Sequence, residues 1–286
     1  MSFHQPAAIL KIGLDSGVYK ARLPAWNLIL RGAMSGAYIG MGAALMIAVT
    51  TGIELTLGPG FTRFIGGMVF PLGVILTILT GAELFTGDAM LAPMAAFRSL
   101  VSWKEVVRLW ILIWLGNLAG ALFFAVLMSQ GPLCTVNAGG ITSVSAAGIT
   151  TVSLASIKCG FGGAGAALSL LGSSLAAGWL LNLAVLLALC ADDAFGKILG
   201  IWFPVMAMTS TGLEHAVTNM YLIPAGIMTA SRLSPLQVAD VGLIITNLGW
   251  VEMWTTNLII VSIGNLLGGL VFAGFLFYIS FIKEID

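Results

Sequence analysis

The segment that decides the fold is Thr80-Gly81-Ala82-Glu83-Leu84-Phe85-Thr86-Gly87-Asp88, which stands inside an apolar run of residues 61–97. That run is too long for one simple crossing of a bilayer, because a transmembrane helix needs about 20 apolar residues. Glycine, threonine and carboxylates are poor material for a helix that faces lipid. Backbone without helical hydrogen bonds is tolerated in a membrane only where it is buried in protein or lines a watery cavity. The segment therefore predicts a membrane helix that is broken near its middle.

A second apolar run, residues 198–230, is interrupted in the same way by Thr209-Ser210-Thr211-Gly212-Leu213-Glu214-His215. In both runs a Phe-Pro pair precedes the Thr-Gly-x-Glu motif and a further proline follows it. The stretch Gly116-Asn117-Leu118-Ala119-Gly120 likewise recurs as Gly264-Asn265-Leu266-Leu267-Gly268. These matches occur in the same order, which indicates an internal repeat.

The composition confines the chain to the membrane. Of its 286 residues 59% are hydrophobic and 8% are charged, and the mean hydropathy is +1.04. Soluble domains carry about 25% charged residues, so the composition argues against a soluble enzyme, a nucleic-acid-binding protein and a disordered chain. The three cysteines form no CxxC pair, and HExxH, GxSxG and P-loop motifs are absent from the sequence. We therefore expect no enzyme, no metal and no cofactor.

Six spans are predicted, at residues 28–53, 61–97, 106–129, 160–191, 198–230 and 255–282. Three spans per half force the second half to enter the membrane from the opposite side, a plan common in transport proteins. We predict an all-α polytopic membrane protein with an inverted three-plus-three repeat and broken second and fifth helices. It forms one membrane domain, 1–286, with an N-terminal helix in 1–27, a first repeat in 28–129, an external loop in 130–157 and a second repeat in 158–286.

Basic residues set the expected orientation. With the N-terminus in the cytoplasm, only Arg63, Lys158 and Arg232 lie outside, and nine basic residues lie inside: Lys11, Lys20, Arg22, Arg31, Arg98, Lys104, Arg108, Lys197 and Lys283. Positive residues favour the cytoplasmic side, so we expect a multi-pass protein of the cell membrane with both termini cytoplasmic. Cys134 and Cys159 fall near the external side, either as a disulfide or as buried thiols.

Four ionisable residues lie at the two breaks: Glu83, Asp88, Glu214 and His215. A charge at mid-membrane is unfavourable by several kcal/mol, so these side chains should face the protein interior. His215 is the only deep group of a type that titrates near neutral pH, and we favour a functional role over a structural helix contact. For Glu83 and Glu214 we favour pairing with a lysine or with freed backbone N–H groups over contact with substrate.

At these residues the sequence resembles the formate/nitrite transporter family. Residues Leu79–Gly87 match its first signature, and Gly212–Met220 match the segment around its central histidine; Gly17–Ala21 and Asn257–Gly269 resemble its N-terminal segment and its last span. The resemblance implies an aquaporin-like protomer, a homopentamer and a pore in each protomer. It also implies transport of small monovalent weak-acid anions such as formate, nitrite, hydrosulfide or lactate. Formate is expected first because it is a common substrate of the family, and a passive channel and a proton-coupled carrier both stay open.

The resemblance also assigns residues. It implies that His215 is the central pore histidine, that Thr86 faces it, and that Lys20 and Glu214 form a pair that anchors the N-terminal helix or tunes the histidine. Lys158 would lie at the outer mouth. Leu84 and Phe85 would line an inner narrowing near Asn182, Val185 and Asn265, and Phe70, Val74 and Met208 an outer one.

These assignments suggest a mechanism. A bare anion in a dry apolar neck is very unfavourable, whereas a neutral weak acid is far less so. We expect Lys20 and Lys158 to raise the local anion concentration, Thr86 to polarise the anion, and His215 or an adjacent water to share a proton with it. A neutral-solute pore of the aquaporin kind would call for paired Asn-Pro-Ala motifs, which the sequence lacks. A scaffold or receptor without transport leaves both breaks and the histidine unexplained.

Overall fold

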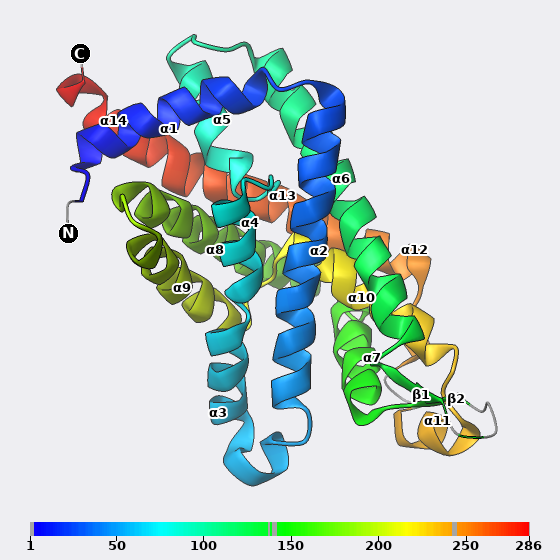
Figure 1. Ribbon diagram of the computed structural model, residues 1–286. Coiled ribbons are helices and arrows are strands. Elements are labelled where there is room, and N and C mark those ends of the chain that lie inside the picture. The colour runs from blue at the N-terminus through cyan, green and yellow to red at the C-terminus, as the bar shows by residue number, and fades with distance from the viewer. Residues whose placement is uncertain (1–2, 137, 139–141, 242–244, 286) are drawn as a thin grey trace.

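The computed structural model describes residues 3–136, 138, 142–241 and 245–285, and it is a bundle of long helices with one short hairpin (Figure 1). Among these residues, five helical stretches are long and apolar enough to cross a membrane: Ala25–Thr50, Glu54–Thr80, Trp103–Gln130, Ala164–Cys190 and Trp250–Glu284. The two shorter helices α9 (Ala194–Ser210) and α10 (Ala216–Ala230) together supply the sixth span. The all-helical architecture with six spans is therefore confirmed.

The first half runs from α1 to α6. Its helices are α1 (Pro6–Ala21), α2 (Ala25–Thr50), α3 (Glu54–Val69), α4 (Leu72–Thr80), α5 (Asp88–Phe97) and α6 (Trp103–Gln130). The predicted second span is interrupted between α4 and α5, as expected. Within α3, Gly58 adopts φ 75°, which only glycine reaches easily, so the regular part of the span begins after that residue.

The second half repeats this plan. Its elements are β1 (Cys134–Val136), β2 (Thr142–Val144), α7 (Ala146–Cys159), α8 (Ala164–Cys190), α9, α10, α11 (Pro235–Val241), the 3-10 turn η1 (Ile245–Asn247), and a last span built from α12 (Trp250–Glu252), the π-helical η2 (Met253–Leu258), α13 (Ile259–Leu267), the π-helical η3 (Gly268–Phe275), α14 (Leu276–Phe281) and the 3-10 turn η4 (Ile282–Glu284). Both described ends of the chain lie at one end of the bundle, and the hairpin lies at the other (Figure 1).

The predicted loop 130–157 is wrong over α7, although residues 137 and 139–141 of that prediction lie outside the described residues. The serines and threonines of α7 misled the prediction because they favour turns. Here their hydroxyls donate to carbonyls one turn back: Thr151 Oγ1 to Ala147 at 2.8 Å and Ser156 Oγ to Val152 at 2.9 Å. This hides their polarity, so that α7 can pack its small residues against α10. Cys134 and Cys159 are both free and buried.

Small residues bring helices of each half into close contact. Gly36 of α2 lies against the backbone of Asn117 in α6, and Gly178 of α8 lies against the backbone of Asn265 in α13. A side chain at either glycine would collide with that backbone, which no rotamer change relieves. The close approach also places an asparagine of each repeat beside the adjoining helix break.

Candidate functional site

The first break is held by one asparagine of α6. Asn117 Oδ1 accepts from Phe85 N at 2.9 Å, and its Nδ2 donates to Glu83 O at 2.9 Å and to Gly32 O of α2 at 2.8 Å. Gly81 ends α4 with φ 75°, a left-handed conformation that suits glycine. The amide thus replaces the hydrogen bonds that the interrupted helix has lost.

The second break is held in the same way from α13. Asn265 Oδ1 accepts from Ala216 N, and its Nδ2 donates to Glu214 O and to Ser174 O of α8, each at 2.8 Å. Gly212 again has φ 75°. Glu83 and Phe85 occupy the same positions in the first motif as Glu214 and Ala216 in the second. The hydrogen bonds of the two breaks therefore correspond one to one, which confirms the internal repeat.

His215 is the N-cap of α10 and faces the other break. Its Nε2 lies 2.8 Å from Thr86 Oγ1, and its Nδ1 lies 2.8 Å from Thr218 Oγ1 and accepts from Thr218 N at 3.3 Å. A backbone N–H can only donate, so Nδ1 is an acceptor and the neutral ring carries its proton on Nε2. Nε2–H then donates to Thr86, which leaves the hydroxyl hydrogen of Thr86 free to point at a third group.

Asn182 of α8 fixes the loop that carries Thr86. Its Nδ2 donates to Thr86 O at 2.7 Å and to Gly178 O at 2.8 Å, while its Oδ1 has no hydrogen-bond partner among the described residues. Thr86 and Asn182 are both fully buried. Asn182 therefore holds the threonine in place beside His215 and presents a spare acceptor within the protein.

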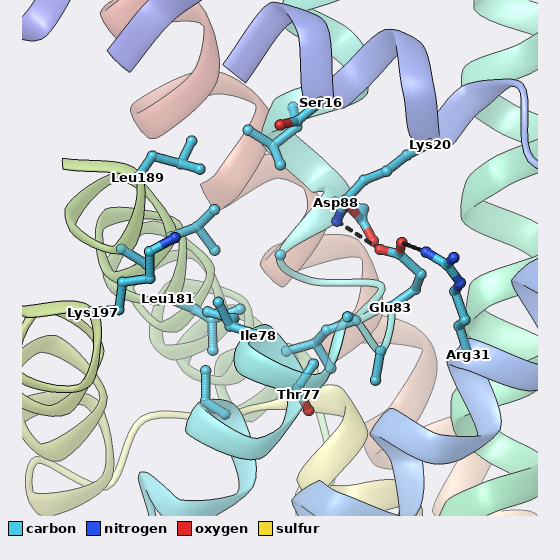
Figure 2. A pocket seen from close by; sticks show the side chains of 18 of the residues that line it. Ser16, Lys20, Arg31, Thr77, Ile78, Glu83, Asp88, Leu181, Leu189 and Lys197 are labelled. Atoms are coloured by element: carbon cyan, nitrogen blue, oxygen red, sulfur yellow. Dashed lines mark hydrogen bonds and ion pairs between the residues drawn. The ribbon is translucent and has the colours of Figure 1, made fainter. Parts of the chain in front are cut away.

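Two cavities approach the hydrogen-bonded pair of Thr86 and His215 from opposite sides. We name the first, of about 310 Å³, the Lys20 cavity; its wall includes Lys20, Leu84, Leu181 and Val185 (Figure 2). The second, of about 420 Å³, is the His215 cavity, whose wall includes His215, Phe70, Met208 and Lys158. No described residue lines both cavities. The buried residues between them form the barrier that a solute would have to pass.

The two lysines differ from the predicted pairing. Lys20 lies 2.6 Å from Glu83 Oε2 and 2.7 Å from Asp88 Oδ1, as Figure 2 shows, and Glu214 pairs with Lys158 instead. The implied Lys20–Glu214 pair is therefore wrong. The physical reason is the repeat: α1 packs on α5 and α7 packs on α10, so each break receives its lysine from the helix that opens its own half.

Lys20 keeps its positive charge in spite of its burial. Burial disfavours the charged form of Lys20, but the carboxylates of Asp88 and Glu83 outweigh burial and hold the pKa of the ammonium above its usual range. Arg31 of α2 also approaches Glu83, with Nη1 at 3.5 Å from Oε1 (Figure 2). Lys20 is thus a cation at any physiological pH, and it is already matched by two acidic groups.

Three residues lie elsewhere than the resemblance implied. Val74 lines the Lys20 cavity with Leu84 rather than the cavity of Phe70, because four residues of helix carry it about 6 Å further along the span. Phe85 lies in a separate apolar groove beside Trp110 of α6, since the chain turns at Leu84–Gly87 and Leu84 and Phe85 point in different directions. Asn265 lines neither cavity and holds the second break.

Sequence reasoning also left residues out of the site. Asp88 was recognised as an ionisable residue at a break but was not included, although it binds Lys20. Its counterpart is Asn219, which donates to Glu214 Oε2 at 2.8 Å. Both lie five residues after the glutamate of their motif, and this shared spacing could have identified them. Asn117 could have been found in the same way, from its match to Asn265.

Comparison with known proteins agrees with this geometry. Residues 7–279 match the family model described as formate/nitrite transporter. The chain is 34% identical to the uncharacterized transporter YrhG of Bacillus subtilis, over 99% of this chain and 96% of that one. It is 32% identical to a probable formate transporter of Methanothermobacter thermautotrophicus, over 99% of both.

The fold is also similar to that of a solved structure. A pentameric formate channel with formate bound superposes with a TM-score of 0.76 at 28% identity, covering 91% of this chain and 98% of that one. The match of the family model along almost the whole chain, together with the two broken helices that meet at His215, shows that the chain belongs to the formate/nitrite transporter family, whose members are transporters and channels rather than enzymes.

Proposed function

We propose that this protein carries small monovalent weak-acid anions across the cell membrane, formate first among them, along a path that joins the Lys20 cavity and the His215 cavity in each protomer. The relative from Methanothermobacter is named a probable formate transporter, and the similar solved structure is a formate channel with formate bound. Nitrite and hydrosulfide have the same charge and the same weak-acid chemistry, and they stand as the alternative substrates.

The observation that carries this proposal is the hydrogen-bonded series Thr86–His215–Thr218, in which His215 and Thr218 line the His215 cavity and Thr86 is buried beside them. An anion that leaves water for this region loses solvation worth many kcal/mol unless it is neutralised. Thr86 can direct its free hydroxyl hydrogen at such an anion while it accepts from Nε2–H. A proton from the water of the His215 cavity, passed on through His215 or through water beside it, joins the anion to form a neutral acid. This acid passes the apolar residues Leu84 and Val74 and returns the proton to water in the Lys20 cavity.

The helix ends at the breaks support the same path. The N-terminus of α10 begins directly after His215, and the N-terminus of α5 begins at Asp88. Free N–H groups and the helix dipole favour negative charge at such ends. Both helix ends lie at the breaks, so they add to the hydroxyl of Thr86 in favouring a transient anion.

Orientation and assembly complete the proposal. The excess of basic residues on the side of the termini supports a cytoplasmic location for both of them. The similar solved channel is described as pentameric, and this supports a homopentamer in which every protomer has its own pore.

Solute flux into liposomes that contain the purified protein tests this function. Formate, nitrite, hydrosulfide and lactate are compared with glycerol and water at equal gradients. We expect rapid formate entry and no entry of glycerol. Glycerol or water flux without anion flux would favour a neutral-solute pore, and the absence of all flux would contradict transport.

A further inference from the structure

Lys20 and Lys158, the lysines expected to attract anions at the two mouths, are already paired with carboxylates. In the Lys20 cavity, Lys20 is bound by Glu83 and Asp88, and Arg31 approaches Glu83 and Tyr19. In the His215 cavity, Lys158 is bound by Glu214. A cation engaged in this way exerts little net attraction on an incoming anion, because the field of each carboxylate opposes it.

One further cation lines each cavity, and neither takes part in these pairs. Lys197 of α9 lines the Lys20 cavity, and Arg63 of α3 lines the His215 cavity. Figure 2 shows Lys197 reaching into the cavity from the side opposite Lys20 and Glu83. Within the described residues, no hydrogen bond or ion pair is recorded for either side chain. The acidic residues nearest to Lys197 in sequence are engaged elsewhere: Asp192 with His4 Nε2 at 2.7 Å and Asp193 with Gly196 N at 2.9 Å.

The formal charges show what these two residues contribute. The walls of the Lys20 cavity hold Lys20, Arg31 and Lys197 against Glu83 and Asp88, and the walls of the His215 cavity hold Lys158 and Arg63 against Glu214. Three positive and two negative charges leave +1 in the first, and two positive and one negative leave +1 in the second. In each cavity, the excess equals the charge of the one cation that has no acidic partner.

The inverted repeat accounts for this arrangement. Lys197 lies six residues before Phe203-Pro204, and Arg63 lies seven residues before Phe70-Pro71. Both belong to the first segment of a broken span, one in each half. Because the halves are inverted, each segment begins on the side of the membrane opposite its own break. Lys197 of the second half therefore lies at the mouth where the first half places Lys20, and Arg63 of the first half lies at the mouth where the second half places Lys158. Two residues at nearly equivalent positions thus serve opposite faces of the membrane.

We propose that Lys197 and Arg63 are the anion-collecting groups of the two mouths, and that each forms a weak site for a monovalent carboxylate or similar small anion before it reaches the His215 barrier. This proposal rests on anion transport as the function. The site must be weak because conduction requires that the anion leave as readily as it enters. The protein group that binds the anion is the ammonium of Lys197 at one mouth and the guanidinium of Arg63 at the other.

The test measures formate flux against formate concentration in inside-out and right-side-out membrane vesicles at low and high ionic strength. The variants are Lys197→Gln and Arg63→Gln, with Lys197→Arg to restore charge. Lys104→Gln is the control, because Lys104 is an exposed cation of α6 that lines neither cavity. One unit charge about 4 Å from an anion in water changes its local concentration about fivefold.

For Lys197→Gln we expect the half-saturating formate concentration to rise about fivefold at low ionic strength when formate enters from the face of the Lys20 cavity. The maximal flux should be preserved, the difference should shrink at high salt, and Lys197→Arg should restore the original value. Arg63→Gln should show the same change from the other face only. An unchanged half-saturating concentration in both variants, a change equal to that of Lys104→Gln, or a loss of maximal flux alone would overturn this proposal. Absence of flux in the unsubstituted protein would instead overturn the proposed function itself.

Discussion

At the scale of single residues, the site depends on a histidine in an unusual structural position. His215 is the N-cap of α10, a place that serine, threonine, asparagine or aspartate usually takes, and its ring accepts from Thr218 N in their stead. The capping bond fixes Nδ1 as the acceptor and directs Nε2 at Thr86. A structural constraint on one nitrogen thereby determines the chemistry available at the other.

The hydroxyl of Thr86 can be tested separately from the ring. Thr86→Val keeps the shape of the side chain and removes both the acceptor for Nε2–H and the donor for an anion. A buried donor left unpaired costs about 1–3 kcal/mol, so we expect formate flux to fall by about tenfold or more while the protein still folds. The control is Thr229→Val, because Thr229 is also buried but its hydroxyl has no partner among the described residues. Equal flux in the two variants would contradict a role for Thr86.

The pairing of Glu214 with Lys158 makes a prediction about stability. Lys158→Met leaves a nearly buried carboxylate without its cation, and breaking a buried ion pair on one side costs about 3–5 kcal/mol. We expect a clear loss of stability in a thermal-unfolding measurement in detergent. The double variant Lys158→Met with Glu214→Gln should recover most of it. Additive losses in the double variant would show that the two side chains do not interact.

At the scale of elements, the broken helices depend on two asparagines that touch neither cavity. Asn117 and Asn265 each satisfy three backbone groups across a break. We expect Asn117→Ala and Asn265→Ala each to lower the free energy of unfolding by about 2–4 kcal/mol, since several buried polar groups lose their partners. Asn27→Ala serves as control because the Oδ1 of Asn27 has no partner among the described residues. A control as destabilised as either variant would contradict this account.

The breaks could be predicted from sequence, and α7 could not. The Thr-Gly-x-Glu motifs recur in order with their prolines, so their positions were evident from residues 80–88 and 209–215. The serines and threonines of α7 instead suggested a loop, and only the structure shows their hydroxyls bonded within the helix. The same helix carries Lys158 to Glu214, whereas the resemblance had implied that Glu214 pairs with Lys20.

At the scale of the whole molecule, composition and repeat order were sufficient for the six-span inverted architecture. The assignment of residues to cavities was less predictable, because a break changes the direction in which each following side chain points. Leu84 and Phe85 are neighbours in sequence, but they line different hollows. The net charge of each cavity was equally hidden, since it depends on which cations find acidic partners in space.

The surface of the bundle makes a prediction about assembly. Large apolar side chains of α6 are exposed, among them Val107, Ile111 and Leu115, and they adjoin the groove of Trp110. We expect the purified protein to form a pentamer in mild detergent, because the similar solved channel is described as pentameric. Native mass spectrometry measures the subunit number directly, and a persistent monomer that still transports formate would contradict the expectation.

The central claim is that an anion crosses the barrier between the cavities by sharing a proton at His215. The most direct measurement is formate uptake by liposomes at two external pH values, for the unsubstituted protein and for His215→Asn, which keeps a polar cap for α10 but cannot titrate. We predict that uptake through the unsubstituted protein rises as external pH falls, and that His215→Asn loses most of the uptake together with its pH dependence. Unchanged uptake with unchanged pH dependence in His215→Asn would contradict the claim.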